Sequence, residues 1–190
     1  MELQDLKSAV DEFPNSQTLL AAWEGWRGRD PVPYRRAVRP EDLRGAMNSV
    51  SVLELPGDGT IVVRLLASLL QEKISENVEL QDMFLLTDEC DEETPKKRYQ
   101  KVVSGPCAMW AENELHLKSG LRFSLYTFAL PVKSDTGDSD FVYRLTELVS
   151  PEPGFEIKLG DIAKTPLSKN ALFFDLNGPE YLEVSGRPDA

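Results

Sequence analysis

The chain has 190 residues, of which 41% are hydrophobic and 28% charged, and its 32 acidic residues outweigh 21 basic ones to give a net charge of −11. This composition is that of a folded globular protein, which excludes collagen, coiled-coil rods and wholly disordered chains. A negative field of this size repels phosphate backbones, so it disfavours a nucleic-acid partner.

The cellular compartment is predicted from the cysteines and from the apolar segments. Cys90 and Cys107 are the two cysteines, too few to build a disulfide framework. Residues 1–5 lack the basic and apolar regions of a signal peptide, and no apolar run approaches the roughly 20 residues of a membrane span. We therefore expect a cytoplasmic protein without membrane association.

Two helices are predicted at the start of the chain. Residues 2–13 carry one apolar stripe with intervals of three and four, formed by Leu3, Leu6, Val10 and Phe13. Pro14 interrupts this helix, and Asn15 or Ser16 can cap a second one that ends at Gly28. Pro40 then begins a short helical turn.

A β-hairpin and a helical connection follow. Strands are predicted over 50–55 and 61–65, with turn residues at 56–59 between them. Residues 69–85 favour short helices. A further helix begins at Thr94 or Pro95, and it places Tyr99, Val102 and Val103 on one face before Gly105 ends it.

Three strands complete the predicted order, over 107–117, 121–131 and 141–149. The second alternates clearly, with Leu121, Phe123, Leu125 and Thr127 on one face. The tail over 150–190 contains one short strand-like piece at 171–174.

The order of two strands, a helical crossover and three strands resembles that of a PAS domain. Trp23 and the segment 26–29, with Pro33 following, resemble the W-x-x-x-R-G-x-x-x-P type opening of one PAS subfamily that occurs mainly in alphaproteobacteria. Residues 40–43 resemble its proline-led turn, 64–68 its Y-R-L-x-G-T type strand end, and 99–106 its last helix and the turn after it.

The resemblance covers about residues 16–149, and it departs from the subfamily pattern in two places. Ala67 replaces the glycine expected after the R-L pair, and residues 74–80 lack the glycines expected there. The implied fold is α+β, with a five-stranded antiparallel sheet in the order 2-1-5-4-3 and helices on one face. The implied organisation is an N-terminal helical extension over 1–48, a PAS-like core over 49–149 and a tail over 150–190.

Motifs for catalysis and for cofactors are missing. The chain has no P-loop, G-x-S-x-G, H-E-x-x-H or C-x-x-C pattern, so we predict no catalytic residues and no enzyme activity. A heme-binding PAS domain needs a histidine on the crossover, yet the lone histidine is His116 on a predicted strand. Cys90 lies in an acidic run without the glycine of a calcium loop. We expect a colourless protein with no heme, flavin or tightly bound metal.

The resemblance also implies a small-molecule cavity between the sheet and the crossover. The candidate ligand-binding residues are Arg64, Met83, Phe84, Tyr99, Val103, Trp110, Phe123 and Tyr126. The same side chains can instead simply fill a core. The predicted function is a stand-alone sensory or regulatory module of bacterial signal transduction, which binds a small apolar ligand or a protein partner that carries the output. The alternative is a structural dimerisation domain with a filled core and no ligand.

The apolar stripe of the first helix needs a partner, because an isolated helix this short is marginal in water. The stripe can fold back on its own sheet or pair with the same helix of a second chain. PAS domains often dimerise through the helix before the first strand, so we predict a homodimer through Leu3, Leu6, Val10 and Phe13.

Overall fold

The computed structural model describes residues 3–72, 80–81, 93–149 and 161–176. Its helical elements are α1 (Leu3–Val10), α2 (Pro14–Arg27), η1 (Arg35–Ala37), η2 (Pro40–Ser49), α3 (Ser68–Gln71) and α4 (Glu93–Ser104). Its strands are β1 (Val50–Leu55), β2 (Val62–Leu65), β3 (Cys107–Leu117), β4 (Arg122–Lys133), β5 (Asp140–Val149) and β6 (Ile162–Asp175). Among these residues, no helix is both long enough and apolar enough to cross a membrane.

The strands form one antiparallel sheet in the order β2-β1-β5-β4-β3-β6. This arrangement confirms the predicted order 2-1-5-4-3, but the predicted number of five strands is wrong. The sixth strand, β6, pairs with β3 along its whole length, from Cys107 opposite Asp175 to Leu117 opposite Ile162. The sequence predicts only a short strand in the tail. The register of the β3–β6 ladder shifts three times, so the side chains of β6 do not follow the simple alternation that marks a strand in a sequence.

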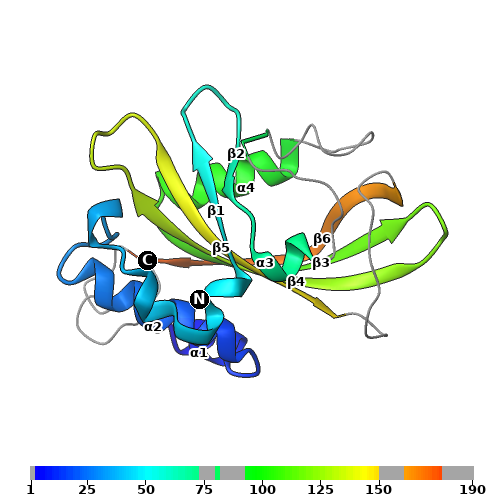
Figure 1. The fold of residues 1–190 in the computed structure, drawn as a ribbon, viewed down its shortest axis with the longest axis horizontal. Coiled ribbons are helices and arrows are strands. Elements are labelled where there is room, and N and C mark those ends of the chain that lie inside the picture. The colour runs from blue at the N-terminus through cyan, green and yellow to red at the C-terminus, as the bar shows by residue number, and fades with distance from the viewer. Residues whose placement is uncertain (1–2, 73–79, 82–92, 150–160, 177–190) are drawn as a thin grey trace.

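Helices cover both faces of the sheet, which corrects the prediction of helices on one face. In Figure 1, α1 and α2 lie on one side of the sheet and α4 lies on the other. The apolar residues separate in the same way. One cluster joins α1, α2 and η2 to the sheet, and a second joins α4 to the opposite face. The physical reason is visible in β4, where every residue from Thr127 to Val132 is buried, so both faces of the strand need a cover.

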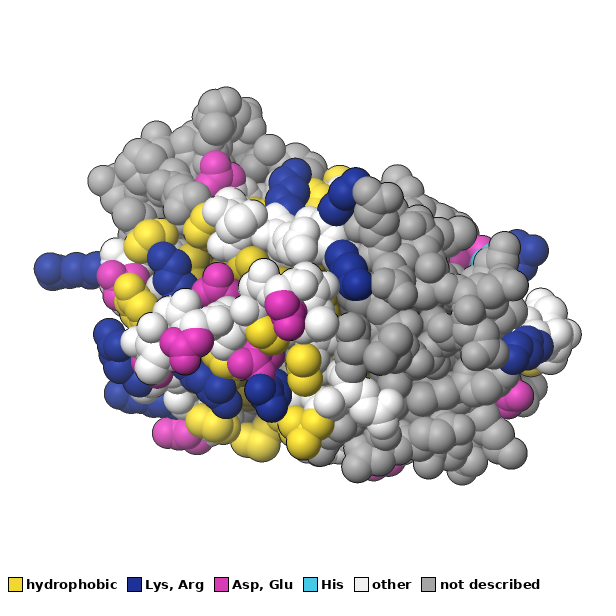
Figure 2. Space-filling view, turned by 90° about the horizontal axis from the view of Figure 1, so that it is seen from above, with side chains coloured by type: hydrophobic (Ala, Val, Ile, Leu, Met, Phe, Trp, Pro, Cys, Tyr) yellow, Lys and Arg dark blue, Asp and Glu magenta, His cyan; other side chains and the backbone are white. Residues whose placement is uncertain are grey.

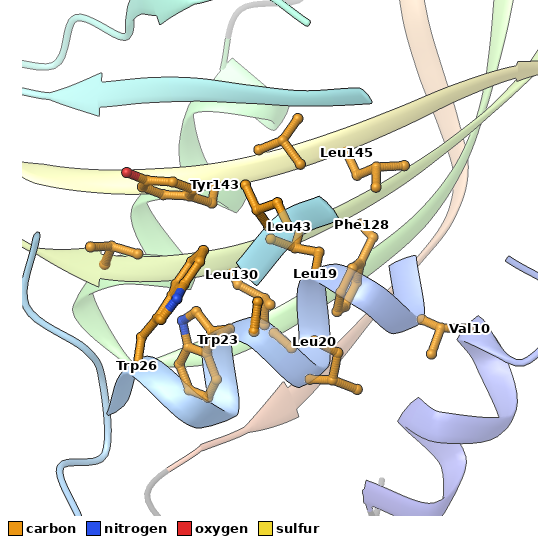
Figure 3. Packing of buried hydrophobic residues seen from close by; sticks show 14 of the residues in the cluster. Val10, Leu19, Leu20, Trp23, Trp26, Leu43, Phe128, Leu130, Tyr143 and Leu145 are labelled. Carbon is orange, nitrogen blue, oxygen red and sulfur yellow. The ribbon is translucent and has the colours of Figure 1, made fainter. Parts of the chain in front are cut away.

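The N-terminal segment is fixed to the sheet by its two helical tryptophans. Trp23 Nε1 donates a hydrogen bond of 2.7 Å to the carbonyl oxygen of Pro131, and Trp26 Nε1 donates one of 2.9 Å to Asp42 Oδ2. Both side chains point from α2 toward the sheet (Figure 3). Gly28 ends the helix with a φ of +56°, a conformation that glycine adopts without strain. The tryptophan and arginine-glycine motif therefore holds the N-terminal segment on the sheet.

The described parts of the crossover pack on the other face. Tyr99 and Val102 of α4 are buried there, as the predicted helix required, and the helix ends before Gly105. Ala67, which replaces an expected glycine, has an ordinary φ of −54° and donates its backbone N–H to Ser51 Oγ at 3.0 Å. Alanine is therefore accommodated without strain. The glycine-free residues 74–79, the acidic run 88–92 and Cys90 lie outside the described residues.

Candidate functional site

The predicted ligand-binding residues divide between the two faces of the sheet. Tyr99 and Val103 belong to the cluster on the α4 face. Trp110 and Tyr126 stack at 5.9 Å in the cluster beneath α1 and α2. Phe123 lies in a third, smaller cluster with Leu115, Leu117 and Leu125. Met83 and Phe84 lie outside the described residues. The structure therefore does not bring the set together as one site.

Arg64 lies at the β1–β2 edge of the sheet, where it forms an ion pair with Glu54. Ser139 Oγ also donates to Glu54, at 2.8 Å. Burial alone would raise the pKa of Glu54, but the hydrogen bonds from Arg64 and Ser139 and the nearby arginine charges lower it. Glu54 therefore stays ionised and holds the Arg64 side chain at this edge.

Three residues of the predicted stripe, Leu6, Val10 and Phe13, pack within their own chain, and the side chain of Leu3 is not among those described. Leu6 and Val10 are almost completely buried, and both belong to the cluster that joins the N-terminal helices to the sheet. The Phe13 ring lies 4.8 Å from that of Trp110 and 5.0 Å from that of Tyr126. Two partners were considered for this stripe, its own sheet or a second chain. In the structure of the single chain, the described stripe residues contact their own sheet. A homodimer through the same side chains would require α1 to leave this position.

A group of polar side chains crosses the sheet face beneath α4. On β5, Arg144 and Thr146 follow Val142 at alternate positions, and Val142 belongs to the α4-side cluster. In the same way, Thr127 lies two positions from Ala129 on β4, and Asn113 lies two positions from Ala111 on β3. Both alanines belong to the α4-side cluster, so Thr127 and Asn113 share that face. We call Asn113, Thr127, Arg144 and Thr146 the polar strip.

Cross-strand pairing and hydrogen bonds connect the polar strip. Thr127 lies directly opposite Thr146 in the β4–β5 ladder. Asn113 Nδ2 donates to Thr127 Oγ1 at 3.1 Å, and Arg144 Nη1 donates to the hydroxyl oxygen of Tyr99 at 3.2 Å. The strip therefore links three central strands to α4.

The polar strip is partly buried beside apolar side chains, with Asn113, Arg144 and Thr146 half-buried. Thr127 and Tyr99 are buried, and Thr146 Oγ1 is inaccessible to solvent and has no hydrogen-bond partner. The apolar neighbours on this face are Val102, Met109, Ala111, Ala129 and Val142. A buried hydroxyl group without a partner costs free energy, which a water molecule or a ligand at this position would recover.

The sequence contained a signal for the polar strip, but the expectation of helices on one face concealed it. The alternation on β5 predicts one face with Phe141, Tyr143 and Leu145, and this face packs against the N-terminal helices. Arg144 and Thr146, at the positions between them, then fall on a face that was expected to be uncovered. With a helix over each face, these same positions become half-buried.

The other side chains considered as cofactor ligands or reactive groups, Cys107 and His116, contact neighbouring groups of the protein. Burial raises the pKa of the Cys107 thiol to about 11, and Sγ lies 3.5 Å from the carbonyl oxygen of Lys101. The lone histidine, His116, places Nε2 2.7 Å from Glu114 Oε2. Within the described ranges, no three His, Cys, Asp or Glu residues are grouped as a metal would need. The expectation of a colourless protein remains a prediction.

The exposed surface carries mixed charges. On the side shown in Figure 2, basic and acidic side chains alternate over the described surface, and hydrophobic side chains form small separate groups. The described part of this view therefore holds no large field of one sign.

A family model described as a PAS domain matches residues 12–145. The match begins just before α2 and ends within β5, so it contains the polar strip except for Thr146, while α1 and β6 lie wholly outside it. No curated protein matches the chain. The model covers well over half of the chain and agrees with the observed strand order, and the chain therefore belongs to the PAS domain family.

Proposed function

We propose that the chain is a sensory module that binds a small ligand between α4 and the sheet, at the polar strip. PAS domains are in general sensory and regulatory modules, which supports a role in binding rather than in catalysis. The observation that carries the proposal is the Thr146 hydroxyl group, which is inaccessible to solvent and has no hydrogen-bond partner beside the apolar cluster under α4. Leaving such a group unsatisfied costs about 1–3 kcal/mol, and a ligand can recover this free energy.

The surroundings of the polar strip suit a ligand with an apolar body and one polar group. Val102, Met109 and Val142 can contact the apolar part, because all three belong to the same cluster as Tyr99. The polar group would lie at the strip. In this proposal, ligand binding changes how the chain contacts a protein partner, and that partner carries the output.

The test is to identify small molecules that copurify with the full chain, by denaturing extraction and mass spectrometry. We expect one small molecule in near-stoichiometric amount, and a large loss of it in the Thr146→Val variant, which keeps the shape but removes the hydroxyl group. Thr136→Val is the matched control, because Thr136 is exposed in the β4–β5 loop. Extracts of the wild-type chain without any bound molecule would overturn the proposal.

The rival function is a dimerisation domain that uses the α1 stripe and holds no ligand. Leu6 and Val10 are buried against their own chain, so this rival requires the two chains to exchange their first helices. Light scattering on the full chain at tens of micromolar tests it. A dimer that becomes a stable monomer after removal of residues 1–13 would favour the rival, whereas a full chain that is already monomeric would exclude it.

A further inference from the structure

We propose that residues 27–44, between α2 and β1, form a docking surface for an acidic segment of a partner protein. The proposal deepens the proposed function, and it rests on that function for the existence of a protein partner. Three observations carry it: the distribution of charge along the chain, arginine side chains that have no partner, and the backbone conformation of Arg44.

Residues 27–44 carry a positive charge within an acidic chain. The segment holds six arginines against three acidic residues, which gives a net charge of +3, whereas the whole chain carries −11. All other residues together therefore carry −14. An acidic partner is repelled by the chain as a whole and attracted by this segment, so the charge distribution favours contact here.

Three of these arginines are exposed and have no partner. Within the described ranges, the side chains of Arg29, Arg39 and Arg44 form no hydrogen bond, ion pair or ring contact. Arg36, by contrast, pairs with Asp135 at 3.1 Å. We call Arg29, Arg39 and Arg44 the arginine group. A guanidinium group offers five donors in a fixed fork that matches a carboxylate, so each member can receive one acidic side chain.

Two hydrogen bonds bring the arginine group to one place. Trp26 Nε1 donates to Asp42 Oδ2 at 2.9 Å, and the backbone N–H of Asp42 donates to the carbonyl oxygen of Arg39 at 3.0 Å. Arg29 follows Trp26 by three residues, and Arg44 follows Asp42 by two. The segment also runs beside the loop between β4 and β5 (Figure 1), where it bonds to the end of β4. The arginine group therefore surrounds a point that α2 and the sheet hold in position.

The backbone of Arg44 supplies an independent observation. Its φ of +47° and ψ of −124° lie in a region that residues other than glycine rarely adopt, and they kink η2 at this position. The Arg44 side chain is exposed and unpaired within the described residues, so its own contacts do not explain this conformation. Backbone strain of this kind concentrates at binding and switch sites, which supports a role of Arg44 in binding.

An acidic protein segment fits this surface better than a nucleic acid does. Asp30, Glu41 and Asp42 lie among the arginines along the chain. A phosphate backbone carries closely spaced charges, so it would meet these carboxylates as well as the −14 of the other residues. A protein segment can instead place single acidic side chains at the arginines and leave uncharged residues opposite the carboxylates.

The test is fluorescence anisotropy with the full chain and a labelled peptide of alternating glutamate and serine. We expect saturable binding that weakens as salt is raised from about 0.05 to about 0.3 M, because salt screens exposed charge pairs. Arg39→Glu should weaken binding about three- to tenfold, and reversal of all three members of the arginine group should abolish it. Arg122→Glu is the matched control and should leave the affinity unchanged. Arg122 is exposed, and it lies at the opposite end of β4 from the residue that bonds to the N-terminal segment.

Arg44→Gly separates binding from folding. Glycine adopts a positive φ without strain, so this variant should keep or raise its thermal midpoint of unfolding. It should nevertheless bind the peptide several-fold more weakly, because the guanidinium group is gone. Unchanged binding by this variant would remove Arg44 from the docking surface and overturn the argument from its backbone.

Three further results would overturn the proposal. They are the absence of saturable peptide binding, an equal loss for Arg122→Glu and Arg39→Glu, and tighter binding of an oligothymidylate of equal charge, which would assign the surface to nucleic acid. The copurification experiment keeps the two proposals apart. A copurified ligand together with a peptide that does not bind would leave the ligand site standing and exclude the docking surface. Peptide binding as expected, without any copurified ligand, would do the reverse.

Discussion

Trp23 joins α2 to β4 through one buried hydrogen bond, so its replacement tests how the N-terminal segment is held. Trp23→Phe keeps most of the buried ring but leaves the Pro131 carbonyl oxygen without this 2.7 Å donor. We expect a loss of about 1–3 kcal/mol in the free energy of unfolding, measured by urea denaturation. Trp26→Phe is the control, because its partner Asp42 is exposed and can be solvated by water. Equal losses for the two variants would contradict this account.

Cys107 provides a pH-dependent measurement at the residue scale. Burial raises its pKa from 9.0 to about 11, so the folded chain favours the neutral thiol. Because the folded pKa exceeds the unfolded one, this contribution to stability is full below pH 9 and is lost as the pH rises from about 9 to 11. We expect the Cys107→Ala variant to lose less stability than the wild type over this range.

The raised pKa of the Cys107 thiol also predicts slow alkylation of this side chain. In a Cys90→Ser background, iodoacetamide should modify folded Cys107 about a hundredfold more slowly at pH 8 than the unfolded chain, because two pKa units reduce the thiolate fraction by that factor. Comparable rates in the folded and the urea-unfolded chain would show that the thiol is not buried as described.

At the scale of elements, α1 can be tested as part of the core. Leu6 is fully buried, whereas its neighbour Lys7 is exposed. Leu6→Ala should therefore lower the free energy of unfolding by about 2–4 kcal/mol, and Lys7→Ala should change it little. Chemical denaturation measures both variants. A Leu6→Ala chain with unchanged stability, accompanied by a lower oligomeric mass in light scattering, would instead place α1 between subunits.

The sixth strand makes a similar prediction. Phe174 is 2% exposed and Leu172 is 37% exposed, although both belong to β6. Phe174→Ala should cost about 3–5 kcal/mol of stability, and Leu172→Ala should cost much less. If both substitutions had the same small effect, β6 would not form part of the core.

The comparison of sequence and structure is informative for particular elements. Strands β1 to β5 were predicted within a residue or two, because alternating apolar residues and clear turns mark them. Strand β6 was mostly missed, since its pairing with β3 shifts register and its position depends on partners 45 to 68 residues earlier in the chain. Periodicity is local, so it identifies strands but cannot show which face a distant helix will cover.

That limit also explains the outcome for the candidate site. Tyr99 and Val103 share one face of the predicted helix by their spacing, and both lie in the cluster between α4 and the sheet. Trp110 and Tyr126 were grouped with them as aromatic residues, but α1 and α2 enclose these two on the opposite face. Predicting the polar strip would require knowing that helices cover both faces of the sheet, and no local sequence pattern contains that information.

For the whole molecule, the central claim is that a ligand binds on the α4 face of the sheet and not beneath the N-terminal helices. The most direct measurement is a titration of ¹⁵N-labelled full chain with the molecule extracted from it, followed by amide chemical shifts. We predict the largest changes at Thr127, Val103 and Thr146. The largest changes at Phe13, Trp110 and Tyr126 would contradict the claim, because they would place the ligand on the opposite face.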